Sequence, residues 1–261
     1  MTKNKIRFCP LASGSKGNSL YLETEQAKVL IDAGLSPKQL ELRLNEIGSS
    51  LDQIDAILVT HDHSDHIAGL GAIWNRYQIP VFTNSETAKA IVTAAGVVPR
   101  FKIFTTGESF VFADLEILPF TIPHDTIDPV GFTIQSGGTK IGVAADLGFG
   151  TSLVKRVLKD CHYLYLEANH EESFVHASPR PRVYKDRVLS KLGHLSNKAS
   201  ADILSEVAHP GLVAVHLAHL SKECNSEAKA LEIVNGVLEN RGIRLNVSIA
   251  YQDQVSEQIL L

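Results

Sequence analysis

The feature that most constrains this chain is a polar cluster at residues 61–66, with the sequence His-Asp-His-Ser-Asp-His. The cluster directly follows residues 54–59, an apolar run that predicts a buried strand. Three histidines and two aspartates therefore lie at the carboxyl end of a strand, where side chains from other strand ends can join them.

The spacing within the cluster suits metal binding. His61 and His63 are two residues apart in extended chain, so they point to the same side and can share one ion through neutral imidazole nitrogens. Near Ala68 the pattern becomes helical, which re-aims Asp65 and His66 so that they can serve a second ion.

A simpler interpretation is a strand-to-helix loop in which Asp65 caps the helix and the histidines are solvated. Such a loop needs one cap and has no need of three imidazoles. We favour a metal site, because a mixture of histidine and aspartate is the donor set of hydrolytic transition-metal centres.

The composition is that of a soluble globular protein, with 44% hydrophobic and 21% charged residues among 261, and we predict one domain over residues 1–261. No apolar stretch approaches the roughly 18 residues that a membrane span needs. The basic amino terminus leads into Pro10 and a Gly/Ser loop instead of an apolar signal core. We therefore expect a cytoplasmic protein with no membrane partner.

The cysteines and the net charge exclude some classes of protein. Cys9, Cys161 and Cys224 are scattered and never in a C-x-x-C spacing, so we predict free thiols instead of a disulfide framework or a thiolate metal site. The net charge of −4 excludes a globally basic nucleic-acid-binding protein. A local positive patch remains compatible with that charge.

Sequence periodicity predicts alternating strands and helices. One helix follows the cap Ser36, has Pro37 at its first position and stops at Gly48. The other predicted helices cover residues 68–74, 85–95, 152–158, 183–192, 198–208 and 226–239. The predicted strands cover residues 7–12, 19–24, 27–31, 54–59, 80–83, 130–135, 139–145, 162–168, 212–218, 244–250 and 255–260, with short strands within 102–122. This order indicates an α/β fold of two sheets covered by helices.

Four further polar side chains follow predicted strands and can complete a two-metal site: Asp32, His124, Asp146 and His219. Each has a simpler explanation, because aspartate at a strand end is common in turns and a single histidine is more often a surface or core residue. We expect Asp32 to orient a ligating imidazole through its ring N–H. His216 competes with His219, but it lies in mid-strand, where a buried, hydrogen-bonded histidine is the favoured interpretation.

These residues, in this order, resemble the metallo-β-lactamase superfamily, and more narrowly the WalJ/YycJ family of DNA exonucleases. The resemblance covers nearly the whole chain. Two positions depart from the family pattern, with Glu171 in place of an aspartate and Cys224 in place of an asparagine. The blocks that carry the resemblance are residues 13–19, 30–34, 60–66, 124–132, 167–170, 193–197 and 217–221.

The resemblance implies a four-layer αββα sandwich of two mixed β-sheets covered by helices, with a dinuclear site at the edge between the sheets. It implies two divalent metal ions per chain, zinc or manganese, with iron as a further candidate. The implied ligands are His61, His63 and His124 for one ion, Asp65, His66 and His219 for the other, and Asp146 as the bridge. The implied activity is 5′-to-3′ exonuclease hydrolysis of DNA by a metal-bridging hydroxide.

We predict catalytic roles for Asp65 and His194. His194 is the candidate for binding a non-bridging phosphate oxygen or protonating the leaving group, a role suited to imidazole near neutral pH. The alternative is a loop histidine that precedes the helix cap at Ser196 or Asn197.

The substrate prediction rests on residues 180–198, where six basic residues and one acidic residue give a local balance of +5. A charge run taken alone is more often a solvated helix face. Because this run surrounds His194, we predict a phosphate-backbone track. The predicted substrate-binding residues are Lys16, Asn169, His170, Arg180, Arg182, Lys185 and Asn197.

Residues 13–19 are Gly-rich but lack the G-x-x-x-x-G-K-[ST] spacing, so we predict no nucleotide cofactor. The expected partner is nucleic acid, DNA rather than RNA, and the oligomeric state stays open. One alternative is a hydrolase of a small ester, thioester or phosphodiester with the same site. Another is a non-catalytic nucleic-acid-binding module, against which the apparently complete ligand set argues.

Overall fold

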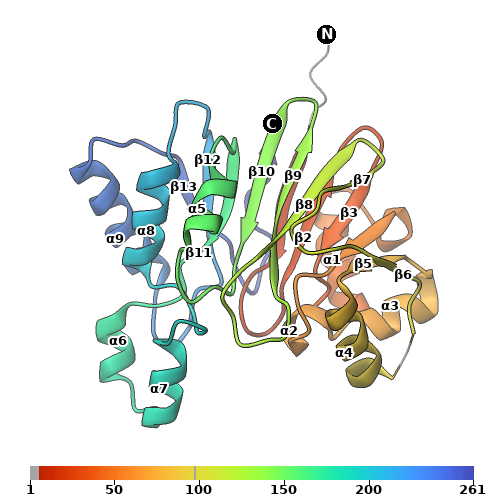
Figure 1. The fold of residues 1–261 in the computed structure, drawn as a ribbon, viewed down its shortest axis with the longest axis horizontal. Coiled ribbons are helices and arrows are strands. Elements are labelled where there is room, and N and C mark those ends of the chain that lie inside the picture. Colours follow the sequence, from red (N-terminus) through yellow and green to blue (C-terminus); the bar gives the residue numbers. More distant parts are fainter. Residues whose placement is uncertain (1–5, 97) are drawn as a thin grey trace.

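Two mixed seven-stranded sheets pack face to face, as the computed structural model shows for residues 6–96 and 98–261 (Figure 1). The first sheet has the order β14 (Ile259–Leu260), β1 (Arg7–Ala12), β2 (Ser19–Glu23), β3 (Lys28–Ile31), β4 (Ala56–Leu58), β5 (Val81–Thr83) and β6 (Phe101–Ile103). The second has the order β13 (Val247–Ile249), β12 (Ala214–Ala218), β11 (Tyr163–Glu167), β10 (Thr139–Ala144), β9 (Val130–Ser136), β8 (Leu115–Thr121) and β7 (Phe110–Phe112).

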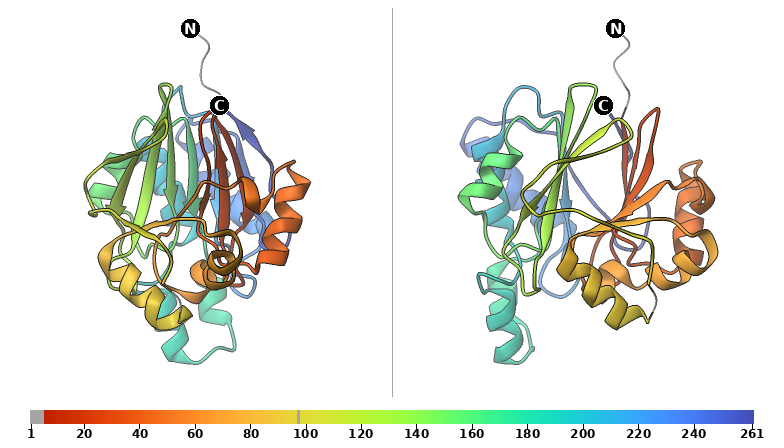
Figure 2. Two further views of the ribbon diagram at one scale, coloured as in Figure 1. Left: turned by 90° about the vertical axis from the view of Figure 1, so that its right-hand side faces the viewer. Right: turned by 45° about the vertical axis from the view of Figure 1, so that its right-hand side comes forward.

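Helices cover the outer faces of both sheets, which confirms the predicted αββα sandwich (Figures 1 and 2). Beside the first sheet lie α1 (Pro37–Glu46), α2 (Ser64–Ile67), α3 (Leu70–Tyr77) and α4 (Ser85–Ala95), with the short helix η1 (Leu51–Gln53) after α1. On the second sheet lie α5 (Ser152–Leu158), α8 (Asn197–Val207) and α9 (Glu227–Asn240). A helical hairpin of α6 (Glu172–Ala177) and α7 (Arg182–Val188) projects beyond the sheet edge (Figure 2).

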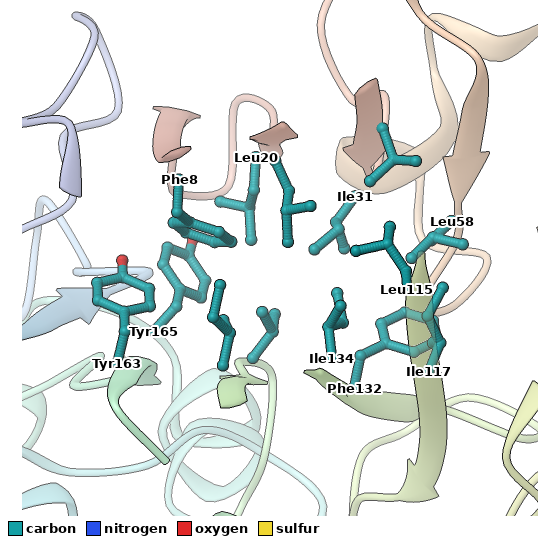
Figure 3. Packing of buried hydrophobic residues seen from close by; sticks show 14 of the residues in the cluster. Phe8, Leu20, Ile31, Leu58, Leu115, Ile117, Phe132, Ile134, Tyr163 and Tyr165 are labelled. Atoms are coloured by element: carbon teal, nitrogen blue, oxygen red, sulfur yellow. The ribbon is translucent and has the colours of Figure 1, made fainter. Parts of the chain in front are cut away.

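Alternate residues of the central strands face different cores, as a period of two requires. In β1, Phe8 packs between the sheets while Cys9 packs under the helices of the first sheet. In β11, Tyr163 and Tyr165 face the space between the sheets, and Leu164 faces the helices of the second sheet. Figure 3 shows Phe8 of the first sheet meeting Tyr163 and Tyr165 of the second. Burial on both faces explains why these strands appear in the sequence as continuous apolar runs.

Strand direction brings the polar strand ends to one edge. β3 and β4 are parallel in the first sheet, and β10, β11 and β12 are parallel in the second. β8 runs the same way as β10, because both are antiparallel to β9. The segments that follow these strands therefore share the edge at which α2 lies, opposite the C-terminus of the chain (Figure 1).

The predicted elements differ from the structure in several places. Neither η1 nor α2 was predicted, and of the predicted strand 255–260 only Ile259–Leu260 forms a strand. The predicted helix 183–192 ends at Val188, because the chain turns at Ser190–Gly193 to deliver His194. Helix α6 was not predicted, since it has six residues and no side-chain cap.

Three smaller predictions can be compared with the structure. His216 is buried, with Nδ1 2.8 Å from the hydroxyl of Tyr163, as predicted for a core histidine. Cys9, Cys161 and Cys224 are free and buried. Of the helices in residues 6–96 and 98–261, none combines the length and apolarity that a membrane crossing requires.

Candidate metal centre

Three imidazole nitrogens from both sheets converge at the edge of the sandwich. Nε2 of His61 and Nε2 of His124 each lie 3.2 Å from Nδ1 of His63. The other ring nitrogens are held in place, because Nδ1 of His61 donates to Thr60 Oγ1 and Nδ1 of His124 donates to the carbonyl of Gly193. Burial lowers the pKa of both His61 and His124, which favours the neutral form that binds metal.

A second group of donors surrounds the adjoining space. Asp65 Oδ2 lies 3.7 Å from Nε2 of His66 and 3.8 Å from Nε2 of His219. Asp146 Oδ2 lies 3.0 Å from Nε2 of His66, and Asp146 Oδ1 lies 4.0 Å from Nε2 of His124. Asp146 therefore stands between the three-histidine group and the second group, where we predicted the bridging residue.

Unpartnered atoms support the fit of these side chains to metal. Buried His219 Nε2 makes no hydrogen bond within the described part of the chain, and buried Asp146 Oδ2 makes none either, although Nε2 of His66 lies 3.0 Å from it. A buried polar atom without a partner is costly, unless a bound ion satisfies it. Imidazole and carboxylate together suit divalent zinc, manganese or iron.

Asp32 orients the His66 ring through the nitrogen that faces away from Asp65 and Asp146. Its Oδ2 accepts a hydrogen bond of 2.8 Å from Nδ1 of His66 and another from Thr60 Oγ1, while its Oδ1 accepts the backbone N–H of Thr60. The contact leaves Nε2 of His66 directed at Asp65 and Asp146.

The buried histidines and carboxylates of the second group shift one another's pKa values. Burial alone would lower the pKa of His66, but the carboxylates of Asp32 and Asp146 outweigh it and raise this pKa to about 10. Burial would also lower the pKa of His219, but Asp146 and Glu167 raise it well above its usual value. Burial opposes ionisation of Asp146, yet His219 and His66 hold its pKa well below its usual value. A metal ion at this position therefore replaces protons.

Strained backbone and close packing fix the strand ends. Asp32, Asp146 and His219 have φ angles of 62°, 57° and 54°, in the left-handed region that residues other than glycine rarely adopt. Gly34 lies so close to the cluster that a Cβ atom there would be 1.6 Å from the carbonyl oxygen of Asp65. Only glycine permits this approach.

Two residues of the Gly/Ser loop support the centre, and sequence reasoning missed them. Asn18 Nδ2 lies 3.1 Å from Asp65 Oδ2 and 3.0 Å from Nε2 of His66. Ser13 Oγ accepts the backbone N–H of His219 at 2.7 Å and contacts the hydroxyl of Tyr165 at 2.6 Å. The loop therefore contacts the metal centre directly.

Glu167 is a further missed residue, although its block had been singled out for the resemblance. It is fully buried, and its Oε1 accepts Nδ1–H of His194 at 2.8 Å and Nδ1–H of His219 at 3.2 Å. Its Oε2 accepts the backbone N–H groups of Leu147 and Leu195. One carboxylate thus orients a predicted ligand and the predicted catalytic histidine.

A cavity of about 510 Å³ opens onto the centre. Its lining includes His63, Asp65, Asp146, His194 and His219. Three predicted substrate-binding residues, Lys16, Asn169 and Arg180, line the same cavity.

Four predicted substrate-binding residues lie elsewhere. Asn197 is fully buried, and its side-chain amide pairs with that of Asn225, which suits support of the site and not contact with substrate. His170 is also buried, with 2% of its surface exposed. Arg182 and Lys185 lie on α7 and do not contribute to the lining of this cavity.

Three acidic residues outside the basic run, Asp125, Asp202 and Glu223, pair with it, so the local balance of +5 overstates the free positive charge. Lys185 donates to the backbone carbonyl of His176, and Lys191 Nζ lies 5.9 Å from the ring centre of Phe149. The other four basic side chains form ion pairs, Arg180–Glu223, Arg182–Asp186, Arg187–Asp125 and Lys198–Asp202.

Residues 12–202 match the family model described as the metallo-beta-lactamase superfamily. The chain is 33% identical to exodeoxyribonuclease YycJ of Bacillus anthracis, over 95% of each protein. It is also 33% identical to exodeoxyribonuclease WalJ of Streptococcus pneumoniae strain D39, over 90% of this chain and 89% of that protein.

A solved structure shares the fold. The metallo-beta-lactamase fold protein YhfI from Bacillus subtilis superposes with a TM-score of 0.75 at 15% sequence identity. The superposition covers 97% of this chain and 99% of YhfI. At this identity the match concerns the arrangement of the sheets and helices alone.

Proposed function

The chain belongs to the metallo-beta-lactamase superfamily, and from that premise we propose that it is a metal-dependent exodeoxyribonuclease. Two relatives that match this chain over nearly their whole length are named exodeoxyribonucleases. The observation that carries the proposal is the convergence of His61, His63 and His124 beside the unpartnered atoms of Asp146 and His219.

We propose a dinuclear centre with zinc or manganese. His61, His63 and His124 would hold one ion and Asp65, His66 and His219 would hold the other, with Asp146 between the two groups. Bound divalent ions supply Lewis acidity and activate water at neutral pH. Asp32 and Asn18 orient this donor set, and Ser13 fixes the backbone at His219.

His194 acts on the substrate. Because its Nδ1 is committed to Glu167, Nε2 is the ring nitrogen that remains for a phosphate oxygen or a leaving group. Glu167 fixes the orientation of the ring. Lys16 lines the same cavity and has no acidic partner within 4.0 Å among residues 6–96 and 98–261, so its charge is available for a phosphate.

The test uses metal-reconstituted protein with single- and double-stranded DNA and RNA, each labelled at either the 5′ or the 3′ end. The proposal predicts stepwise release of nucleotides from the 5′ end of DNA, and a His61→Ala variant that releases none. Absence of cleavage with both zinc and manganese would defeat the nuclease assignment.

The pairing of Arg180 with Glu223 and of Arg187 with Asp125 favours one second candidate, a hydrolase of a small ester or phosphodiester. Both arginines line the cavity, and each is already neutralised by a carboxylate. Salt dependence separates the two functions, because binding to a nucleic-acid backbone weakens steeply with salt. This candidate would be favoured if the protein cleaved no DNA and turned over a small ester at a rate that stays the same between about 50 and 200 mM salt.

A further inference from the structure

Outside the metal-centre cavity, an exposed aromatic ring lies beside an ammonium group that forms no ion pair with a carboxylate in the described part of the chain. Phe149 is 40% exposed, and Lys191 Nζ lies 5.9 Å from its ring centre. Of the six basic residues in 180–198, Lys191 is the one whose contact is an aromatic ring and not an oxygen. Leu192, the next residue, is 51% exposed. We call Phe149, Lys191 and Leu192 together the rim.

The rim is attached to the metal centre through two short segments. Phe149 is three residues after Asp146, and Lys191 is three residues before His194. The two segments touch, since a Cβ atom on Gly148 would lie 2.3 Å from the carbonyl oxygen of Lys191. Gly193 in turn accepts the hydrogen bond from Nδ1 of His124. Three residues span at most about 10 Å, so the ring lies within a few nucleotide spacings of the centre.

We propose that Phe149 is a stacking platform for an unpaired nucleobase near the scissile phosphodiester, with Lys191 contacting the adjacent phosphate. This inference rests on the proposed nuclease function and adds the substrate class, a nucleic acid with a frayed or single-stranded end. Every base has a π face that stacks on an exposed aromatic ring, and a nearby cation holds the backbone. A base in a continuous duplex is stacked on its neighbours, so the platform selects unpaired ends.

The experiment measures stacking without cleavage. A single-stranded oligonucleotide with a nuclease-resistant phosphorothioate backbone and 2-aminopurine near its 5′ end is titrated with metal-loaded protein, and quenching of the base reports stacking. Wild type and Phe149→Trp are expected to quench strongly, while Phe149→Ala loses the quenching. Phe174→Ala is the matched control, because Phe174 is also 40% exposed but lies on α6. It is expected to behave as wild type.

A second readout uses the metal-loaded enzyme. Phe149→Ala is expected to raise KM for single-stranded DNA by roughly 5- to 150-fold, the range that one stacked base contributes. The metal content of Phe149→Ala, measured on the same preparation, should stay that of wild type. Lys191→Gln should reduce the salt dependence of binding by about one ion.

The outcomes separate the inference from the proposed function. Equal quenching by wild type, Phe149→Ala and Phe174→Ala would overturn the platform, whatever the enzyme cleaves. Loss of quenching in Phe149→Ala alone would support it, even if no DNA were cut. Failure to cut DNA would then count against the nuclease function only.

Discussion

Asp32 accepts a hydrogen bond of 2.8 Å from Nδ1 of His66, across a sequence separation of 34 residues. The bond joins the residue that follows β3 to helix α2, and it fixes which ring nitrogen of His66 faces Asp146. Such partners commonly decide the affinity of a metal site as much as the ligands do.

Asp32→Ala should therefore weaken metal binding by roughly 10- to 100-fold, while the circular dichroism spectrum stays that of wild type. Competition with a chelator measures the affinity. Asp52→Ala, on the exposed side of η1, is the control and should bind metal normally. Unchanged affinity in Asp32→Ala would show that Asp32 only supports the fold.

His194→Ala should retain its full metal content and lose most turnover of DNA, by roughly 100- to 10,000-fold, the contribution of a positioned acid or base. Elemental analysis and a nuclease assay on the same preparation check both parts. His176→Ala, an exposed histidine on α6, should be as active as wild type. Loss of metal from His194→Ala would instead make His194 a ligand.

Gly34→Ala should disrupt the metal centre, because the added Cβ would lie 1.6 Å from the carbonyl oxygen of Asp65 and must displace it. We expect at least a tenfold loss of metal affinity and destabilisation by about 1–3 kcal/mol. Gly236→Ala is the matched control, since Gly236 lies within α9 with open space around its Cβ position. It should stabilise the protein by up to about 1 kcal/mol. The two variants would unfold alike if packing at Gly34 were unimportant.

His216 should make stability depend on pH. Burial lowers its pKa in the folded protein from 6.5 to about 4, so below pH 6.5 the unfolded chain takes up a proton that the folded protein does not. This contribution is complete above about pH 6.5, declines as the pH falls toward 4, and amounts to about 3 kcal/mol.

Urea unfolding of wild type and His216→Gln in EDTA, at several pH values between 7 and 4, measures this contribution. The free energy of unfolding of wild type should fall more steeply than that of the variant. Parallel curves would show that His216 does not titrate differently in the two states.

Local sequence patterns predicted the elements well where one segment decides its own structure. The helix that begins at Pro37 has its predicted cap at Ser36, and the strand at 7–12 occurs as predicted. The short helix α6 lacks a side-chain cap and was missed. Strand ends also indicated which polar residues to consider for the site.

Contacts between distant segments were beyond the sequence. Ser13 and His219 are 206 residues apart, and Asn18 and Asp65 are 47 apart, so no local pattern relates them. The same limit affected the basic run, because Asp125 and Glu223 neutralise two of its arginines from segments far along the chain. Charge counted along a sequence omits such partners.

The order of the predicted ligands along the chain has a consequence for protein synthesis. The first sheet supplies its four ligands within residues 61–66, but the last ligand, His219, follows β12 late in the chain. A ribosome that stalls before His219 releases a fragment with an open, incomplete donor set. The complete set of predicted ligands therefore exists only after β12 and His219 have been synthesised.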